Sequence, residues 1–248
     1  MAAPLTLDIV SAEEEQAWNR RHLAEPVTAP VIRFWGYREP AVVLGCSQRH
    51  AVSAETVRER TGLDLAARDA GGGAVLVGPW MLSASILLPL GHRYAQQPPA
   101  LSYHWLGEAY RLALAEAGIA SEVLTPETAR ILQREADPAI GWACYGGFSP
   151  GEVVVGRRKL VGLAQVRRAK GVLFVAGLLF GRTDWALLCR AFERPPGEAQ
   201  RLVDGNTCCV DEAGEALLSP LALLCSLQQR LQASLGEGVE PWPSVCPG

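Results

Sequence analysis

The sequence predicts an α+β domain in which one mixed, largely antiparallel sheet is covered by helices. Strand-like and helix-like segments are interspersed along the 248 residues without a strict strand–helix alternation. Three consecutive strand-like segments, at 152–180, are joined by turns too short for a crossover helix, which favours antiparallel pairing. Apolar residues make up 49% of the chain and charged residues 20%, so there is enough apolar material for a folded core.

Helices are predicted from capping residues and from apolar periodicity. Ser11 followed by Glu14 matches a capping box and predicts a first helix over 12–24. Apolar residues at helical spacing predict a second helix over 101–118, where Gly118 is typical of a left-handed C-terminal residue. Further helices are expected over 53–60 before Gly62, after Thr125-Pro126-Glu127, from Thr183 to Phe192, and from Ser219-Pro220 to Leu235.

Strands are predicted from apolar and β-branched runs that lie between turn residues. The expected strands are VIRFW, AVVLG, LDLAAR, AVLV, LSASILLP, EVVV, KLVGLAQVRR and VLFVAGLLF. Turns are expected at GYREP, at Gly156 and at Ala169-Lys170-Gly171. The last twelve residues, EGVEPWPSVCPG, are expected to be irregular.

Composition excludes several classes of partner and site. The net charge of −3 gives no general reason to expect a nucleic-acid partner. No apolar run reaches the roughly 18 residues of a spanning helix, so no membrane partner is expected. The N-terminus lacks the pattern of a signal peptide, which predicts a cytoplasmic location. The seven cysteines show no zinc-ligand spacing, and no metal site is predicted.

The segment ARDAGGGAVLV places three glycines, Gly71, Gly72 and Gly73, between two strand candidates. Glycine permits close backbone approach, so consecutive amides can point at an anion. Arg68 can pair with a phosphate or a carboxylate through its guanidinium fork. The alternatives are a flexible hairpin turn for the glycines and an exposed strand-end charge for Arg68. The segment matches neither a Rossmann fingerprint nor a P-loop.

The segment VVVGRRKLVGLAQVRR places Arg157, Arg158 and Lys159 directly before an apolar strand. A lysine at this position can donate hydrogen bonds to a carbonyl or phosphate oxygen and stabilise charge that develops during acyl transfer. The alternative is a turn lysine in water. Gly162 either lets a ligand lie against the strand or marks a bulge.

Together these two motifs resemble those of lipoate–protein ligases and octanoyltransferases, in the superfamily that also contains biotin–protein ligases. RDAGGGAV is similar to the family segment R-R-x-S-G-G-G-A-V, and GRRKLVGLAQVRR is similar to G-x-K-[IVL]-x-G-S-A-Q-x-R. AVVLGCSQ looks like the upstream family strand, with Gln48 in its glutamine position. The resemblance covers residues 30–180 and implies the fold of the biotin/lipoate protein ligase catalytic domain.

The resemblance also implies roles for individual residues. Lys159 matches the family lysine that contacts the acyl carbonyl and, in ligases, the adenylate phosphate. The glycines 71–73 match the loop that wraps the acyl chain and its activating group, and Arg68 matches the second arginine of that motif. Gly162, Ala164 and Gln165 match the strand that lines the acyl tunnel.

Cys144 is a candidate nucleophile on the same grounds. CYGGFSPGEVVV is similar to C-F-x-x-x-S-x-x-E-[LV]-x-V of octanoyltransferases that work through an acyl-enzyme, matching at Cys144, Ser149 and Glu152. A neighbouring cation favours the thiolate, which is the form that attacks a thioester. The alternative is a small packed residue in a loop.

Departures from the family pattern bear on whether the acyl group is activated by ATP or taken from an acyl thioester. Ala70 stands where serine is usual, LVGPWMLSAS replaces YHDxGNLNFS, and Val175-Ala176-Gly177 replaces Q-H-G. These losses weaken nucleotide contacts more than acyl binding, so ATP with Mg²⁺ is a less favoured cofactor than a ready acyl thioester. Residues 200–248 are too few for the usual accessory C-terminal domain, so a single catalytic domain over 1–248 is expected.

The resemblance implies an enzyme that transfers a lipoyl or octanoyl group to a lysine of a lipoyl-carrier domain. Such carriers are dehydrogenase E2 subunits or glycine-cleavage H-type proteins, and an acyl-carrier protein would be the donor on the transferase route. The alternative is a degenerate member that binds an acyl group or a carrier without chemistry. Biotin ligation is disfavoured, because the G-R-G-R-R-G-R type loop is absent.

Overall fold

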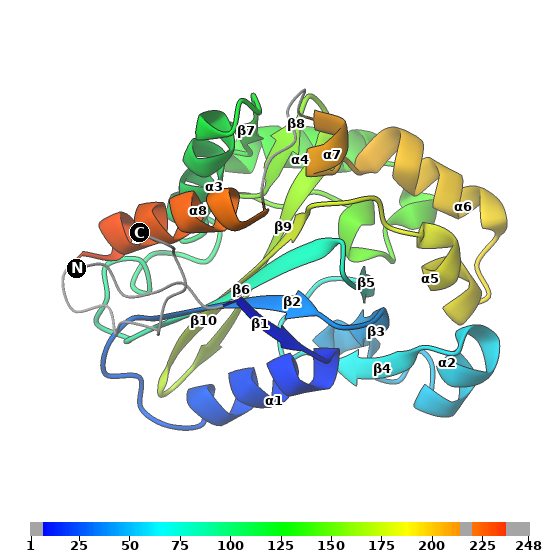
Figure 1. The fold of residues 1–248 in the computed structure, drawn as a ribbon, viewed down its shortest axis with the longest axis horizontal. Helices are drawn as coiled ribbons and strands as arrows, with labels where there is room; N and C mark the ends of the chain where they lie inside the picture. The colour runs from blue at the N-terminus through cyan, green and yellow to red at the C-terminus, as the bar shows by residue number, and fades with distance from the viewer. Residues whose placement is uncertain (1–6, 214–219, 237–248) are drawn as a thin grey trace.

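A computed structural model describes residues 7–213 and 220–236 of the protein (Figure 1). Its largest element is a seven-stranded sheet with the order β1-β2-β6-β10-β9-β8-β7. The strands are Leu7–Val10 (β1), Val31–Tyr37 (β2), Met81–Leu88 (β6), Gly171–Leu179 (β10), Arg158–Arg168 (β9), Val153–Val155 (β8) and Glu122–Val123 (β7). β1 is parallel to β2, and the other neighbours are antiparallel. The predicted α+β fold with a largely antiparallel sheet is confirmed.

Three strands form a second sheet, so the expectation of one sheet is wrong. Ala41–Leu44 (β3) lies between Asp64–Ala67 (β4), to which it is parallel, and Val75–Val77 (β5), to which it is antiparallel. Both edges of β2 are already occupied by β1 and β6, so β3 cannot pair with β2 across the turn. The crossover from β3 to β4 contains the helix Ala54–Thr61 (α2), as a parallel pair requires.

One face of the large sheet is covered by the helix Ala12–Leu23 (α1), which begins at the predicted capping box. The Glu14 amide donates to Ser11 Oγ at 3.2 Å, and the Ser11 amide donates to Glu14 Oε2 at 2.6 Å. Trp18 and Leu23 of this helix pack with Trp35, Leu87 and Leu173 of the sheet. Figure 1 shows α1 below the large sheet.

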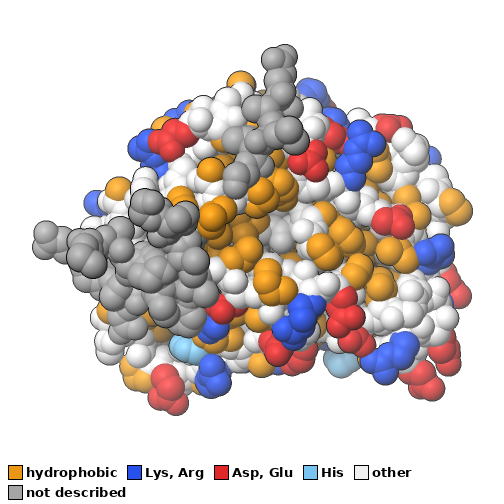
Figure 2. Space-filling view, in the orientation of Figure 1, with side chains coloured by type: hydrophobic (Ala, Val, Ile, Leu, Met, Phe, Trp, Pro, Cys, Tyr) orange, Lys and Arg blue, Asp and Glu red, His pale blue; other side chains and the backbone are white. Residues whose placement is uncertain are grey.

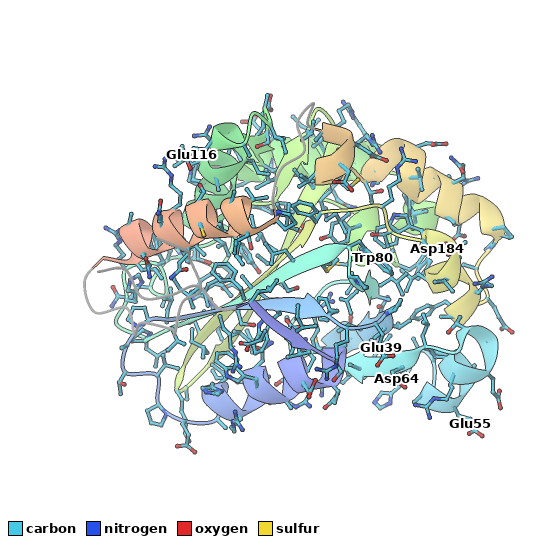
Figure 3. All side chains as sticks on the ribbon, in the orientation of Figure 1. Glu39, Glu55, Asp64, Trp80, Glu116 and Asp184 are labelled. Atoms are coloured by element: carbon cyan, nitrogen blue, oxygen red, sulfur yellow. The ribbon has the colours of Figure 1, made fainter. Side chains whose placement is uncertain are left out.

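The opposite face is covered by the helices His104–Glu116 (α3) and Pro220–Leu235 (α8). Gly118 has φ +77° just beyond α3, which confirms its predicted left-handed conformation. Glu116, labelled in Figure 3, ties the two helices together by accepting from Ser226 and Arg230 of α8. Ser219 and the tail expected to be irregular lie outside the described residues.

Shorter helices and helical turns complete the described part of the fold. The α-helices are Pro126–Glu135 (α4), Trp185–Ala191 (α5), Pro196–Arg201 (α6) and Val210–Ala213 (α7). The 3₁₀-helices are Cys46–Gln48 (η1), Pro138–Ile140 (η2) and Cys144–Gly146 (η3). A π-helix covers Leu202–Asn206 (η4).

Two helix starts test the predicted caps. Thr125 caps α4 as expected. The cap of α5 is Asp184, labelled in Figure 3, rather than Thr183: its Oδ1 accepts from the Ala186 amide at 3.1 Å. A carboxylate at the start of a helix also interacts favourably with the helix dipole.

Apolar side chains gather across the middle of the face shown in Figure 2, and charged side chains lie mainly around its margins. Among the described residues, no helix combines the length and apolar character needed to cross a membrane.

Candidate acyl-transfer site

A cavity lies over the large sheet where three neighbouring strands carry very small residues. Gly162 of β9 is opposite Gly177 of β10, which is opposite Ser83 of β6. Directly paired residues present their side chains to the same face, so this row leaves space between the sheet and the structure above it. Ala164, Val175 and Ser85 form the next row on the same face.

The cavity is mainly apolar. Val43, Val75 and Val77 of the small sheet, together with Met81, Leu163 and Val175 of the large sheet, contribute to its wall. Tyr145 covers the two glycines: its hydroxyl donates to the Gly177 carbonyl at 2.6 Å, and a Cβ on Gly162 would lie 3.4 Å from its ring. Gly162 and Ala164 both line this cavity.

The glycine loop lies against the segment that carries Cys144. A Cβ on Gly73 would lie 2.2 Å from the Trp142 carbonyl oxygen, so this contact requires glycine. The Ala74 amide donates to the Trp142 carbonyl at 3.1 Å, and the Cys144 amide donates to the Ala74 carbonyl at 2.8 Å. Gly72 has φ +94°, and a Cβ built on it would lie 3.9 Å from Cys144 Sγ. The loop thereby sits beside the thiol.

Arg68 holds the glycine loop in shape. Its Nε and Nη2 donate to the Gly71 carbonyl at 3.2 and 3.1 Å, and Nη2 also donates to the Gly73 carbonyl at 2.8 Å. The residue is 7% exposed and contributes to the wall of the apolar cavity. The structure thus places Arg68 within the loop rather than at an exposed strand end.

Lys159 is buried beside the same segment. Its Nζ donates to the Cys144 carbonyl at 3.0 Å and lies 2.9 and 2.8 Å from the two carboxylate oxygens of Glu152. The rings of Tyr145 and Phe148 lie 5.6 and 5.7 Å from Nζ, within the range of a cation–π interaction. Lys159 is only 1% exposed, so the alternative of a turn lysine in water is wrong.

Glu152 is the main partner of Lys159. Burial raises the pKa of the Glu152 carboxyl above its ordinary value, while Lys159 and the Ser149 amide, which donates at 2.7 Å, oppose the increase. The sequence motif included Glu152 and Ser149, but only the structure shows that Glu152 pairs with Lys159 and accepts a hydrogen bond from the Ser149 amide.

A second, open cavity with a volume of about 430 Å³ lies outside the apolar one. Its wall includes the three loop glycines, Lys159, Glu152 and Gln165. The Gln165 amide donates to the Pro99 carbonyl at 3.1 Å and to Ser102 Oγ at 3.2 Å, which fixes the loop that borders this cavity. Gln165 therefore lies on the outer cavity, whereas Gly162 lies on the inner one.

Cys144 borders both cavities, together with Leu163 and Ala164. It is the first residue of η3 and is partly exposed. The arrangement offers a small apolar cavity of about 60 Å³, an open cleft and a thiol between them. Among the described residues, no three His, Cys, Asp or Glu side chains are grouped in a way that could hold a metal ion.

Four polar residues of the inner cavity that the sequence analysis does not name are Glu15, Gln16, Tyr37 and Ser83. The Tyr37 hydroxyl lies 2.7 Å from Glu15 Oε2 and 2.8 Å from Ser83 Oγ. An acid in the first turn of a helix normally interacts with the helix dipole at the surface, so no local signal indicated that Glu15 is buried.

Comparison with known proteins agrees with this geometry. Residues 11–213 match the model of the lipoyl protein ligase A/B catalytic domain. The chain belongs to this family.

Relatives in the lipoyl protein ligase A/B family include proteins named octanoyltransferase LipM. That of Symbiobacterium thermophilum is 28% identical over 78% of this chain and 69% of its own length. That of Exiguobacterium sibiricum is 31% identical over 58% of this chain and 52% of its own length. The matched part thus spans between about half and two thirds of these curated relatives.

Solved structures share the fold at low identity. A lipoate-protein ligase A bound with ATP has a TM-score of 0.66 at 17% identity, with 95% of this chain and 86% of that chain covered. A bipartite lipoate protein ligase from Thermoplasma acidophilum, described with its E2 lipoyl domain, has a TM-score of 0.67 at 18% identity, with coverages of 95% and 84%.

Four of the positions that depart from the family pattern line the inner cavity. Val77, Met81 and Ser83 come from the segment that replaces YHDxGNLNFS, and all three contribute to the cavity wall. Val175, from the segment that replaces Q-H-G, does the same, and the neighbouring Gly177, which keeps the family glycine, also lines the cavity. The replacements make the wall of this family member predominantly apolar.

Proposed function

We propose that this protein transfers an octanoyl or lipoyl group to a lysine of a lipoyl-carrier domain through an acyl-enzyme on Cys144. The observation that carries the proposal is the position of Cys144 at the junction of the apolar cavity and the open cleft. An acyl chain held in the inner cavity would present its carbonyl to the thiol, and the donor and the acceptor would approach from the cleft.

The reaction has two steps that balance. In the first, Cys144 Sγ, as the thiolate, attacks the carbonyl carbon of an acyl-carrier thioester, forms a new thioester and expels the carrier thiolate, which takes up a proton. In the second, the acceptor lysine amine attacks the enzyme thioester, an amide forms, the amine loses a proton and the Cys144 thiolate is released. The named octanoyltransferases among the relatives support this route.

The cations at the site favour the thioester route over ATP-dependent activation. Arg68 and Lys159 are the Lys and Arg side chains that line the two cavities in the described ranges. Arg68 donates to loop carbonyls, and Lys159 is paired with Glu152. A nucleotide phosphate would have to displace these partners, whereas a thioester brings no charge of its own to the reacting carbonyl.

In this proposal Lys159 acts as a correctly placed hydrogen-bond donor to the reacting carbonyl, because its charge is already paired with Glu152. Its bond to the Cys144 carbonyl fixes the backbone that carries the nucleophile, and a small rotation of the chain would bring an N–H toward a developing oxyanion. The acceptor partner is proposed to be a lipoyl domain, in line with the archaeal ligase described with its E2 lipoyl domain.

Incubation with an apo lipoyl domain under two conditions tests the route. Octanoyl-acyl carrier protein without ATP should yield octanoyl-lysine on the acceptor, detected by its mass. Octanoate or lipoate with [α-³²P]ATP and Mg²⁺ should yield neither a labelled acyl-adenylate nor a modified acceptor. Formation of the adenylate would establish the ligase route instead, and failure of both arms would favour the non-catalytic alternative.

A further inference from the structure

A buried polar cluster closes one end of the otherwise apolar inner cavity. It consists of Glu15 from α1, Tyr37 from β2 and Ser83 from β6, which are 2%, 3% and 4% exposed. The Tyr37 hydroxyl contacts both Glu15 Oε2 and Ser83 Oγ. A hydroxyl has one proton, so it donates to only one of them, and the other must donate to Tyr37.

The sheet order places this cluster at the end of the cavity opposite Cys144. Cys144 borders the cavity together with Leu163 and Ala164 of β9, so it lies at the β9 side of the cavity. From there the cavity passes over Gly177 of β10 to Ser83 of β6 and Tyr37 of β2, in the order in which the strands pair. A chain attached at the thiol and lying in the cavity would therefore point its distal end at the cluster.

The charge state of Glu15 matters for an apolar occupant. Burial raises the pKa of Glu15 to about 7, and hydrogen bonds from Tyr37 and Gln16 and the charge of Arg68 oppose the increase. The groups that face it are Tyr37 from β2, Ser83 from β6, Gln16 from its own helix and Arg68 from the loop after β4. Glu15 is thus uncharged at the acidic side of neutrality and becomes an anion above it.

We propose that Glu15 is a specificity-determining residue of the acyl site: uncharged and hydrogen-bonded to Tyr37, it closes the inner end of the cavity and excludes long acyl chains. The inference rests on the proposed function, since it takes the cavity to be the acyl chamber. The cavity of about 60 Å³ must widen to admit a medium-length chain, which then ends against the cluster, whereas a longer chain must also break the contacts among Glu15, Tyr37 and Ser83. An ionised Glu15 disfavours either chain, because an apolar occupant removes the water around the charge.

Direct binding tests this proposal without depending on acyl transfer. Octanoyl- and dodecanoyl-N-acetylcysteamine thioesters, which carry no charge between pH 6 and 8, are titrated into the full-length Cys144→Ser protein by calorimetry. The octanoyl probe should bind more tightly than the dodecanoyl probe. Its affinity should fall about tenfold from pH 6 to pH 8, as expected for exclusive binding to the neutral form of a group that titrates near 7.

Variants at Glu15, each added to Cys144→Ser, separate length control from charge. Glu15→Gln is always neutral, so octanoyl affinity should no longer depend on pH while the preference for the shorter chain remains. Glu15→Ala should change the ratio of octanoyl to dodecanoyl affinity about tenfold or more in favour of dodecanoyl. A tenfold change corresponds to the free energy of one pK unit. Glu13→Gln, a surface change on the same helix, is the matched control and should leave both properties unaltered.

The proposal is overturned if Glu15→Gln retains the pH dependence of Glu13→Gln, a result that does not require the alanine variant to fold. It is also overturned if the unmodified cavity binds both chains equally. Acylation of Cys144 in the wild-type protein is measured in parallel. Probe binding without acylation would contradict the proposed function but keep the cluster's role, and no probe binding in any variant would contradict both.

Discussion

Lys159 is expected to contribute both to the reaction and to the stability of the fold. Its ammonium group contacts the Cys144 carbonyl and both oxygens of Glu152 in a buried environment. A buried ion pair is costly to desolvate, and removing one partner leaves the other charge without compensation. Loss of activity on substitution of Lys159 can therefore come from the chemistry or from the fold, and the two must be measured separately.

Substitution of Lys159 by alanine should lower octanoyl transfer by about 10²–10³-fold, the effect of losing one oxyanion donor. It should also reduce the free energy of unfolding by about 3–5 kcal/mol, because Glu152 remains buried without its partner. Transfer is measured on an apo lipoyl domain and stability by urea denaturation.

The matched control is the double variant Lys159→Met with Glu152→Gln, which removes both charges and keeps similar volumes. We expect it to recover most of the stability but not the transfer rate. Full transfer by Lys159→Ala would show that the lysine has no part in the reaction.

Sequence reasoning located Lys159 but not Glu15, and the reason is physical. A cation that runs directly into an apolar strand is a local conflict, and the conflict is visible in the sequence. Glu15 follows two other acids at the start of α1, where acids are favoured by the helix dipole. Its burial depends on contacts with β2 and β6 that are distant in the sequence, so nothing nearby indicates it.

The glycine loop between β4 and β5 shows how an element can require one glycine and tolerate change at another. A Cβ on Gly73 would overlap the backbone of Trp142 and Ala143, whereas a Cβ on Gly71 would have no atom within 4 Å. The contact between this loop and residues 142–144 places Cys144 beside the glycines.

Gly73→Ala should push the loop away from Cys144 and reduce acylation of the thiol by at least tenfold, at a cost of about 1–3 kcal/mol in stability for overpacking. Gly71→Ala is the matched control and should retain near wild-type acylation and stability. Acylation is followed by intact mass after incubation with octanoyl-acyl carrier protein. Equal acylation of the two variants would contradict the role given to the loop.

Element types followed from local patterns, whereas their pairing did not. The hairpin of β9 and β10 was predictable because a short turn leaves antiparallel pairing as the simplest arrangement. The second sheet was not predictable, because β3 leaves β2 after a turn that would equally suit a hairpin. β1 was missed because four residues carry too weak a pattern to distinguish a strand from a loop.

At the scale of the whole molecule, the site forms where the two sheets meet. The small sheet supplies three valines and the loop glycines, and the large sheet supplies Lys159 and the row of small residues. The cavity must stay open between them, so the protein buries polar groups there that a sealed core would avoid. Burial raises the pKa of both Glu15 and Glu152, so ionising either carboxyl group in the folded protein costs free energy.

The contribution of Glu15 to the stability of the whole protein should therefore decrease as pH rises through neutrality. The pKa of Glu15 rises from 4.5 to about 7 on folding, so the folded state binds more protons than the unfolded state between these values. The associated stability is fully present below pH 4.5 and is lost as pH rises through 7. Glu15→Gln should gain about 2 kcal/mol relative to wild type between pH 5 and pH 8.

Urea denaturation at the two pH values measures this difference, with Glu13→Gln as the surface control. A pH dependence that is identical in wild type and Glu15→Gln would show that Glu15 titrates normally in the folded protein.

The central claim is that Cys144 carries the acyl group, and the mass of the protein tests it most directly. Wild-type protein is incubated with octanoyl-acyl carrier protein in the absence of acceptor, and the products are analysed intact and after proteolysis. We predict one octanoyl group per chain, located on Cys144, released by neutral hydroxylamine and absent from Cys144→Ser. An unmodified protein that nevertheless octanoylates an apo lipoyl domain, or an adduct on another residue, would contradict the account.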